Sequence, residues 1–235
     1  MKRQPIINHT TELDPKFAAL VSWFREQLIA WFELNKRSFP WREATRTPYE
    51  LVVAEILLQR TPASSVAKIY HDFLERFPSW AILSRATSED LEKSIKGLGL
   101  SKLKVGIFQN LCKALEEYKG NIPTSRADLE AIKGVGQYTA STILAIVHGQ
   151  REPFVDVNMA RVLGRFFGRG IKSDVRDDPE LHVLARYIVN MEKCLQINWA
   201  ILDLSASVCK FSRPTCEECP LQKKCQFLHQ DLPES

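Results

Sequence analysis

The sequence predicts an all-α fold, because apolar residues recur at helical spacing along nearly all of its 235 residues. No segment shows the period-two alternation of apolar and polar residues that a half-buried strand requires. Helix-start signals precede several of the periodic segments, and the connections between them are short, without an internal repeat. With an apolar content of 45%, the chain can form one large core or two small ones. About ten helices are therefore expected.

The first helix is predicted by apolar residues that share one helical face. They are Phe17, Leu20, Val21, Phe24, Leu28 and Trp31. A second helix starts at Thr47, which is a capping residue; Pro48 occupies the first turn and Glu50 completes a capping box. Pro62 is expected to begin one further helix that runs to Leu74.

The second half of the chain continues in helices. Thr87 with Asp90 opens a short helix that ends near Gly97. The remaining helices are expected at 102–118, at 128–133, at 137–148, from Asp178 and Pro179 onward, and at about 199–209.

Composition limits the classes of partner. The net charge of +4 suits an anionic partner without identifying one. The basic start of the chain is not followed by an apolar stretch, so no secretory signal is expected. The longest apolar run, near Ile143 to Val147, is too short to cross a bilayer. We therefore expect a cytoplasmic protein that does not use a membrane as partner.

Cysteine spacing indicates a metal site. Four of the six cysteines lie within one short stretch, at Cys209, Cys216, Cys219 and Cys225. Without a secretory signal, such a quartet is more typical of metal binding than of disulfides. The spacing by itself permits either zinc or a [4Fe–4S] cluster. Cys112 and Cys194 stand alone and are expected to be small buried side chains.

A glycine turn, Gly134-Val135-Gly136, joins the two helices predicted at 128–133 and 137–148. The glycines allow a tight reversal and a close approach of a phosphate to the backbone amides at the next helix start. Val135 would anchor the turn in the core. An ordinary connection with a glycine cap is the alternative interpretation.

The segment Phe154 to Val162 places Asp156 between apolar residues just before a helix. Alone, Asp156 could be a simple helix cap. Together, the glycine turn, this VDxNxxRV segment and the cysteine loop resemble the helix-hairpin-helix DNA glycosylase superfamily, in the same order. That superfamily contains endonuclease III and the adenine and thymine mismatch glycosylases. The resemblance covers residues from about 20 to 228.

The resemblance implies a catalytic role for Asp156. Its carboxylate would stabilise the positive charge that develops on the sugar and would orient or deprotonate a water molecule. Asn158 would hydrogen-bond nearby backbone or sugar-phosphate and help to hold Asp156 in place, or would simply cap the helix. Members that also nick the backbone carry a Lys where this sequence has Tyr138. A phenol cannot form the Schiff base, and Lys133 lies on the other side of the turn, so a monofunctional glycosylase is expected.

The resemblance is shared by two branches that remove different bases. In the adenine enzymes the residue matching Glu55 protonates the leaving purine, and the one matching Gln59 fills the space of the flipped base. Leu100 or Ser101 would be the wedge, and this pair resembles the thymine mismatch branch. The adenine enzymes also carry a further C-terminal domain, whereas this sequence stops ten residues after Cys225.

We therefore expect removal of thymine or uracil opposite guanine. Removal of adenine opposite oxidised guanine is the alternative, and a non-catalytic iron–sulfur module that binds mismatches is a third possibility. With a pyrimidine target the role of Glu55 is uncertain, and Glu55 could instead be a surface residue. Gln59 departs mildly from the thymine branch, where an Arg can stand.

For the cysteine loop, the resemblance implies a structural [4Fe–4S] cluster. Lys223 and Lys224, with Lys210 and Arg213, form a basic edge suited to DNA phosphates, although solvated lysines are the simpler interpretation.

The implied architecture has a six-helix domain at 40–150 that carries the hairpin. Residues 1–39 and 151–235 would form a discontinuous second domain around the cluster. Double-stranded DNA with a mismatched or damaged base would lie between the domains, its target base flipped out. The protein is expected to be a monomer, associated with the nucleoid if its source is a prokaryote.

Overall fold

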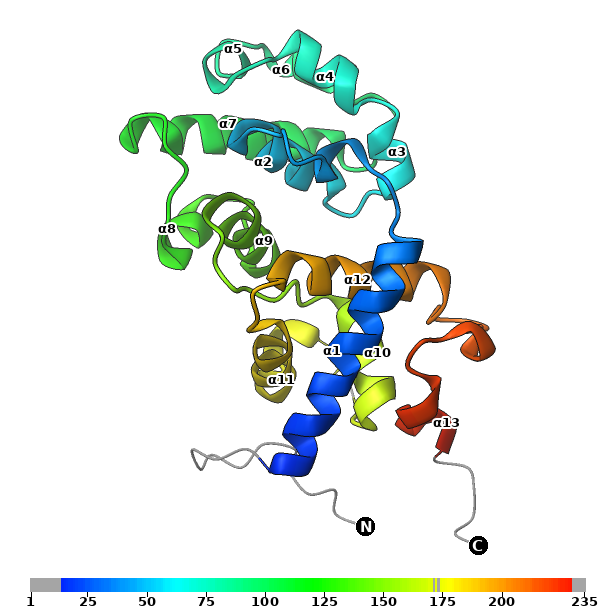
Figure 1. Cartoon of the computed structure of the whole chain (residues 1–235). Helices are drawn as coiled ribbons and strands as arrows, with labels where there is room; N and C mark the ends of the chain where they lie inside the picture. Colours follow the sequence, from blue (N-terminus) through cyan, green and yellow to red (C-terminus); the bar gives the residue numbers. More distant parts are fainter. Residues whose placement is uncertain (1–13, 171, 173, 230–235) are drawn as a thin grey trace, which may run out of the picture. The chain divides into compact units, whose positions relative to one another are not determined.

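The structure, a computed structural model, describes residues 14–170, 172 and 174–229. The described chain contains helices and no strand, which confirms the all-α prediction (Figure 1). It divides into a central unit, residues 38–150, and a terminal unit formed by the described residues before 38 and after 150. None of the described helices is long and apolar enough to span a membrane.

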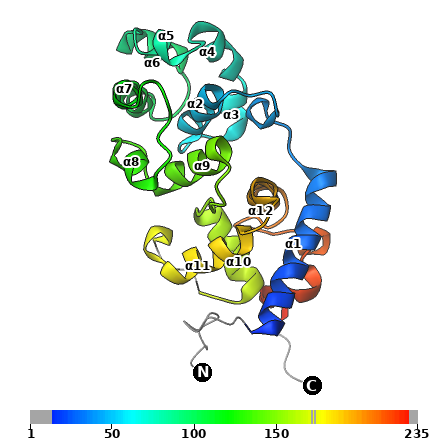
Figure 2. The same cartoon turned by 60° about the vertical axis from the view of Figure 1, so that its left-hand side comes forward.

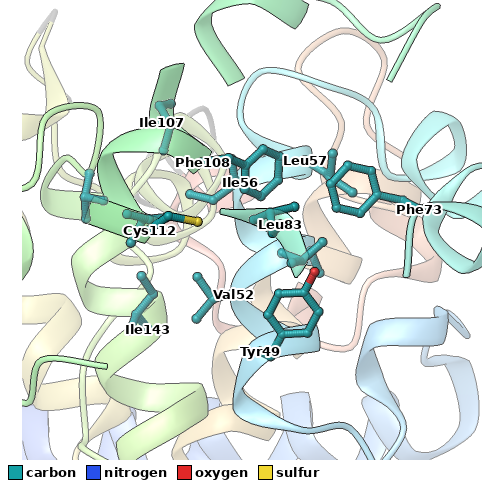
Figure 3. Close-up of a cluster of buried hydrophobic side chains, with 14 of the residues drawn as sticks. Tyr49, Val52, Ile56, Leu57, Phe73, Leu83, Ile107, Phe108, Cys112 and Ile143 are labelled. Carbon is teal, nitrogen blue, oxygen red and sulfur yellow. The ribbon is translucent and has the colours of Figure 1, made fainter. Parts of the chain in front are cut away.

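The central unit is built around α2. Its elements are η1 (Pro40–Arg42), α2 (Pro48–Leu58), α3 (Ala63–Ala67), α4 (Tyr70–Arg76), α5 (Trp80–Leu83), α6 (Ser88–Ser94), α7 (Ser101–Glu117), α8 (Arg126–Ala131) and α9 (Gln137–His148). Figure 3 shows apolar side chains of α2, α4, α7 and α9 that meet in one cluster. Val52, Ile56 and Leu57 of α2 are fully buried, and burial of each such side chain stabilises the fold by about 1.5–3 kcal/mol.

The start of α2 follows the predicted capping box. The Thr47 hydroxyl accepts a hydrogen bond from the Glu50 amide, and the Thr47 amide donates to the Glu50 carboxylate over 2.7 Å. Pro48 occupies the first turn. Two of the amides that a helix start leaves without partners are thus satisfied locally, and the prediction is confirmed.

The predicted single helix from Pro62 to Leu74 is wrong, because the chain breaks between α3 and α4. The Ile69 amide bonds to the Val66 carbonyl, three residues back, so the α-helical pattern is interrupted there. The break turns Tyr70 into the core, where its hydroxyl donates to the Glu50 carbonyl over 2.9 Å. Burial of this aromatic ring outweighs the continuity of one short helix.

The terminal unit combines segments from both ends of the chain. Its elements are α1 (Pro15–Asn35), α10 (Val157–Phe167), η2 (Val175–Asp177), α11 (Pro179–Val189), α12 (Cys194–Ser207), η3 (Cys216–Glu218), η4 (Gln222–Lys224) and α13 (Gln226–His229). Helix α12 packs against α1, α10 and α11 (Figure 2). It begins earlier than predicted, because residues on its first turns, such as Ile197 and Asn198, are buried against its neighbours.

Asn198 docks the segment that leads into α10. Its side-chain oxygen accepts from the Phe154 amide over 2.9 Å, and its side-chain nitrogen donates to the Glu152 carbonyl over 3.0 Å. One buried amide therefore satisfies two backbone groups of an irregular segment. This contact fixes the backbone just ahead of Asp156.

Candidate active site

Asp156 is the N-cap of α10, and both of its carboxylate oxygens are engaged. One oxygen accepts from the amides of Asn158 and Met159 over 2.9 and 2.8 Å, and the other accepts from the Asn158 side chain over 2.7 Å. Burial raises the pKa of Asp156, while these hydrogen bonds and the charge of Arg161 act in the opposite direction. The capping role is thus real, and the predicted contact with Asn158 is confirmed. The result is a recessed carboxylate with one fixed orientation.

Arg161 extends this network to the start of the cysteine loop. Its guanidinium donates to the Asn158 side-chain oxygen over 3.1 Å and to the carbonyls of Ser205 and Cys209 over 3.1 and 2.9 Å. Sequence reasoning did not assign Arg161 this part. A usable signal existed, because Asn158, Arg161 and Arg165 recur at helical spacing on one face of α10.

The four cysteines of the loop are free, partly buried thiols. Burial raises the pKa of Cys219 to about 11, and the charges of Cys209, Cys225 and Cys216 add to this effect. Arg165 donates to the carbonyls of Lys210 and Phe211 over 2.8 and 3.0 Å and so holds the loop against α10. Among the described residues, no group of three or more potential ligands is spaced for a metal ion. The donor set itself, four unpaired thiols in one loop, suits a group that takes four thiolates.

The two other cysteines and the two loop lysines also have defined places. Cys112 and Cys194 are buried, as predicted. Lys223 and Lys224 are both exposed, but the Lys224 ammonium lies 4.8 Å from the centre of the Trp23 ring. This cation–π contact ties the loop to α1. The two lysines are therefore not equivalent.

In the central unit, the glycine turn connects α8 and α9. Gly134 has a φ of +99°, and a Cβ there would lie 2.3 Å from Cγ1 of Ile107. Val135 is 3% exposed and belongs to the core cluster, so the anchoring role predicted for it is confirmed. Gly136 caps α9 without a side-chain hydrogen bond, and a Cβ there would meet open space. Gly134 is thus required by backbone and packing, whereas Gly136 keeps the helix start accessible.

Gln59 ends α2 and reaches this turn. Its side-chain nitrogen donates to the Thr139 hydroxyl over 3.1 Å and to the Gly134 carbonyl over 3.3 Å.

Leu100, ahead of α7, has a φ of +62° and is 44% exposed. Ser101 follows it as the first residue of α7. An exposed apolar side chain in the left-handed region is unusual outside functional loops.

Glu55 lies one turn before Gln59 on α2 and is not an exposed surface residue. Burial raises the pKa of Glu55 to about 7, although the Thr142 hydroxyl and the charge of Arg42 act to lower it. Tyr138 is half-buried and precedes Thr142 by one turn of α9, so the two share a face of that helix. A carboxyl with a pKa near 7 can give or accept a proton at neutral pH.

The raised pKa of Glu55 predicts that the free energy of unfolding depends on pH. Because the folded pKa of about 7 exceeds the ordinary 4.5, Glu55 contributes stability that is complete below pH 4.5 and is lost as pH rises through 7. Between about pH 5.5 and about pH 7.5, the wild type should lose about 2 kcal/mol more than Glu55→Gln. Denaturant unfolding of both proteins at several pH values measures this difference. Parallel pH curves would contradict the assigned pKa.

The predicted site residues fall into two groups. The structure brings Glu55, Gln59 and the glycine turn together in the central unit, where α2 packs on α9. It brings Asp156, Asn158 and the cysteine loop together in the terminal unit through Arg161.

Two helices joined by a glycine hairpin, a capped aspartate and a four-cysteine loop, in a chain whose described residues form helices and no strand, are typical of a helix-hairpin-helix protein. The model of the HhH-GPD superfamily of base excision DNA repair proteins matches residues 53–178, more than half of the chain. The chain belongs to this superfamily.

Individual relatives agree with this assignment. A thymine/uracil-DNA glycosylase of Methanothermobacter thermautotrophicus is 31% identical over 87% of this chain and 92% of its own. The human adenine DNA glycosylase is 32% identical over 88% of this chain and 40% of its own. The solved structure of a thermostable thymine-DNA glycosylase superposes with a TM-score of 0.84 at 30% identity, covering 91% of this chain and 98% of that one.

Proposed function

We propose that this base excision repair protein is a monofunctional DNA glycosylase that hydrolytically removes thymine or uracil opposite guanine. The proposal depends most on the Asp156 carboxylate, which is recessed, fixed by three hydrogen bonds and linked through Asn158 and Arg161 to the start of the cysteine loop. The relatives named thymine/uracil-DNA glycosylase and thymine-DNA glycosylase support the choice of base.

Asp156 would act on the sugar. As the glycosidic bond lengthens, positive charge develops on the sugar ring, and a nearby carboxylate stabilises it. The stabilisation is strong because a recessed site screens charge less than water does. The donors from Asn158 and Met159 keep the carboxylate from rotating, so no reorganisation is needed at the moment of bond cleavage.

Tyr138 would determine how the reaction ends. It stands on the first turn of α9, directly after the glycine turn and Gln137. Its phenol cannot attack the sugar to form a Schiff base. Water, oriented by Asp156, would then complete the reaction and leave an intact abasic site.

The hairpin and the exposed turns of the central unit would bind double-stranded DNA. Gly134, Val135 and Gly136 would present the backbone amides of the α9 start to one phosphate. Gln59 would fill the space of the flipped base, and Leu100 or Ser101 would wedge into the duplex.

In the terminal unit, Asn158 and the loop lysines Lys223 and Lys224 would add contacts to the sugar-phosphate backbone. The contact of Lys224 with Trp23 favours Lys223 as the freer of the two lysines. The protein would act as a monomer.

The cysteine loop would hold a structural [4Fe–4S] cluster. Cys209, Cys216, Cys219 and Cys225 supply the thiolates that such a cluster takes. When bound, the cluster would cross-link the loop. Arg161 and Arg165 would hold the loop against α10 through the carbonyls of Cys209, Lys210 and Phe211.

Adenine is the second candidate for the excised base, because Glu55 has the pKa of a proton donor at neutral pH. A purine leaves more readily when it is protonated, whereas a thymine leaves as an anion stabilised by hydrogen bonds to its carbonyl oxygens. The relative named adenine DNA glycosylase supports this alternative.

The test is base release from duplexes that contain T:G, U:G or A:8-oxoguanine. We expect alkali-labile sites in the first two duplexes, intact strands without alkali, and no covalent adduct after borohydride reduction. Separation of the strands on a denaturing gel measures all three outcomes. Activity on the third duplex alone would transfer the assignment to adenine, and a strong borohydride adduct would contradict the role of Tyr138.

A further inference from the structure

Lys104 carries a buried charge in the central unit. It lies on α7 with 0% exposure, and its ammonium donates to the backbone carbonyl of Gln59. Among the described residues no carboxylate pairs with it. Burial disfavours the charged form and lowers the pKa of Lys104 to about 8. In an apolar variant of similar volume, the loss of this one hydrogen bond should be largely offset by relief of the buried charge, so stability should change little.

The carbonyl that Lys104 binds belongs to a turn with an unfavourable backbone conformation. Arg60, directly after Gln59, has a φ of +51°, in the left-handed region that non-glycine residues rarely adopt. Such a conformation persists only when surrounding contacts impose it. The Lys104 ammonium and the Thr61 hydroxyl, the latter over 3.2 Å, both donate to the Gln59 carbonyl. These two hydrogen bonds hold the backbone of the turn in place.

The side chain of Gln59 is held separately, by the Thr139 hydroxyl and the Gly134 carbonyl. The same face of α7 that carries Lys104 also supports the glycine turn. Ile107 packs beneath Gly134, and the Asn110 side chain donates to the Lys133 carbonyl over 2.9 Å. One helix thus sets the Gln59 turn and the hairpin relative to each other.

We propose that Lys104 is a positioning residue that holds Gln59 where it can fill the gap left by the flipped base. This inference deepens the proposed function and rests on it. Lys104 is fully buried, so it would not itself contact the base or the sugar. It acts through the Gln59 carbonyl, which fixes the direction in which the Gln59 side chain leaves the end of α2.

The first test is Lys104→Met, which keeps the length of the side chain and removes its charge. The single-turnover rate of base release should fall roughly tenfold to hundredfold, as expected when a group that organises the site is misplaced. Affinity for undamaged duplex and the thermal midpoint should not fall. Lys113→Met is the matched control, because Lys113 is exposed on the same helix. An unchanged rate in Lys104→Met would overturn the inference.

The second test asks whether Lys104 acts through Gln59. In the cycle of Lys104→Met, Gln59→Ala and the double variant, the double variant should be no slower than Gln59→Ala alone. Effects that multiply would show that Lys104 acts elsewhere, and would overturn the inference. If Lys104→Met does not fold, Lys104→Gln takes its place in the same cycle.

The two proposals can fail separately. The wild-type protein reports on the proposed function through the duplex from which it releases a base. The ratio of variant to wild-type rates, measured on that same duplex, reports on Lys104. If the wild type releases adenine, the assigned base is wrong. The ratio of rates measured on that duplex still tests the role of Lys104.

Discussion

Asp156→Asn should lower the rate of base release by about 10²–10³-fold, with little change in stability or in DNA binding. Asn caps helices about as well as Asp, and its side-chain oxygen can accept from the amides of Asn158 and Met159. The substitution therefore removes the negative charge while the start of α10 stays capped. Single-turnover base release and duplex affinity, measured together, separate the two effects.

Asp14→Asn provides the matched control, because Asp14 also caps a helix, α1, through its side chain. It should leave base release unchanged. Full activity in Asp156→Asn would show that the carboxylate serves only as a cap. Binding of mismatched duplex by a wild type that releases no base would instead favour a non-catalytic mismatch-binding module.

Gly134→Ala should be the most destabilising single methyl addition in the hairpin. A left-handed backbone costs an L-residue about 1–2 kcal/mol, and overpacking against Ile107 costs about 1–3 kcal/mol, together about 2–5 kcal/mol. Denaturant unfolding measures the loss. In a double-variant cycle, Gly134→Ala should cost less in an Ile107→Ala background than in the wild type, because the added methyl then has no Ile107 side chain to meet.

Gly136→Ala is the natural partner of that variant. A methyl at Gly136 meets open space, and the φ there is −92°, so stability should change little. DNA affinity should fall, because the methyl would occupy the approach of the phosphate to the start of α9. Equal loss of stability in the Gly134 and Gly136 variants would contradict the distinction between them.

The features that the sequence predicted are those with local causes. The capping box at Thr47, the cap at Asp156 and the buried Val135 depend on residues a few positions apart, so spacing alone reveals them. The contacts that the sequence did not predict join residues that lie far apart along the chain. Lys104 meets the Gln59 carbonyl across 45 residues, and Arg161 meets the Cys209 carbonyl across 48. Such pairs exist only after helices pack, and no periodicity of one segment encodes them.

The break between α3 and α4 has a related cause. The periodicity at 62–74 is helical throughout, and tertiary burial of Tyr70 decides against one continuous helix. The four-residue α5 is too short for a periodic signal, although Ser79 caps it through the Ile82 amide. Local pattern therefore gives the number and type of the long helices better than it gives the junctions.

The connectivity of the terminal unit has a consequence for biosynthesis. The central unit is one continuous stretch of chain, so it can collapse as soon as residue 150 has left the ribosome. Helix α1 is made first but packs on α12, and the ion pair of the partly exposed Arg37 with the buried Asp203 closes a loop of 166 residues. Closing so long a loop is slow and carries an entropic cost that a folded central unit reduces by shortening the free chain. The apolar face of α1, with Phe24 and Leu28, therefore lacks its packing partner in the nascent chain until α12 has been synthesised.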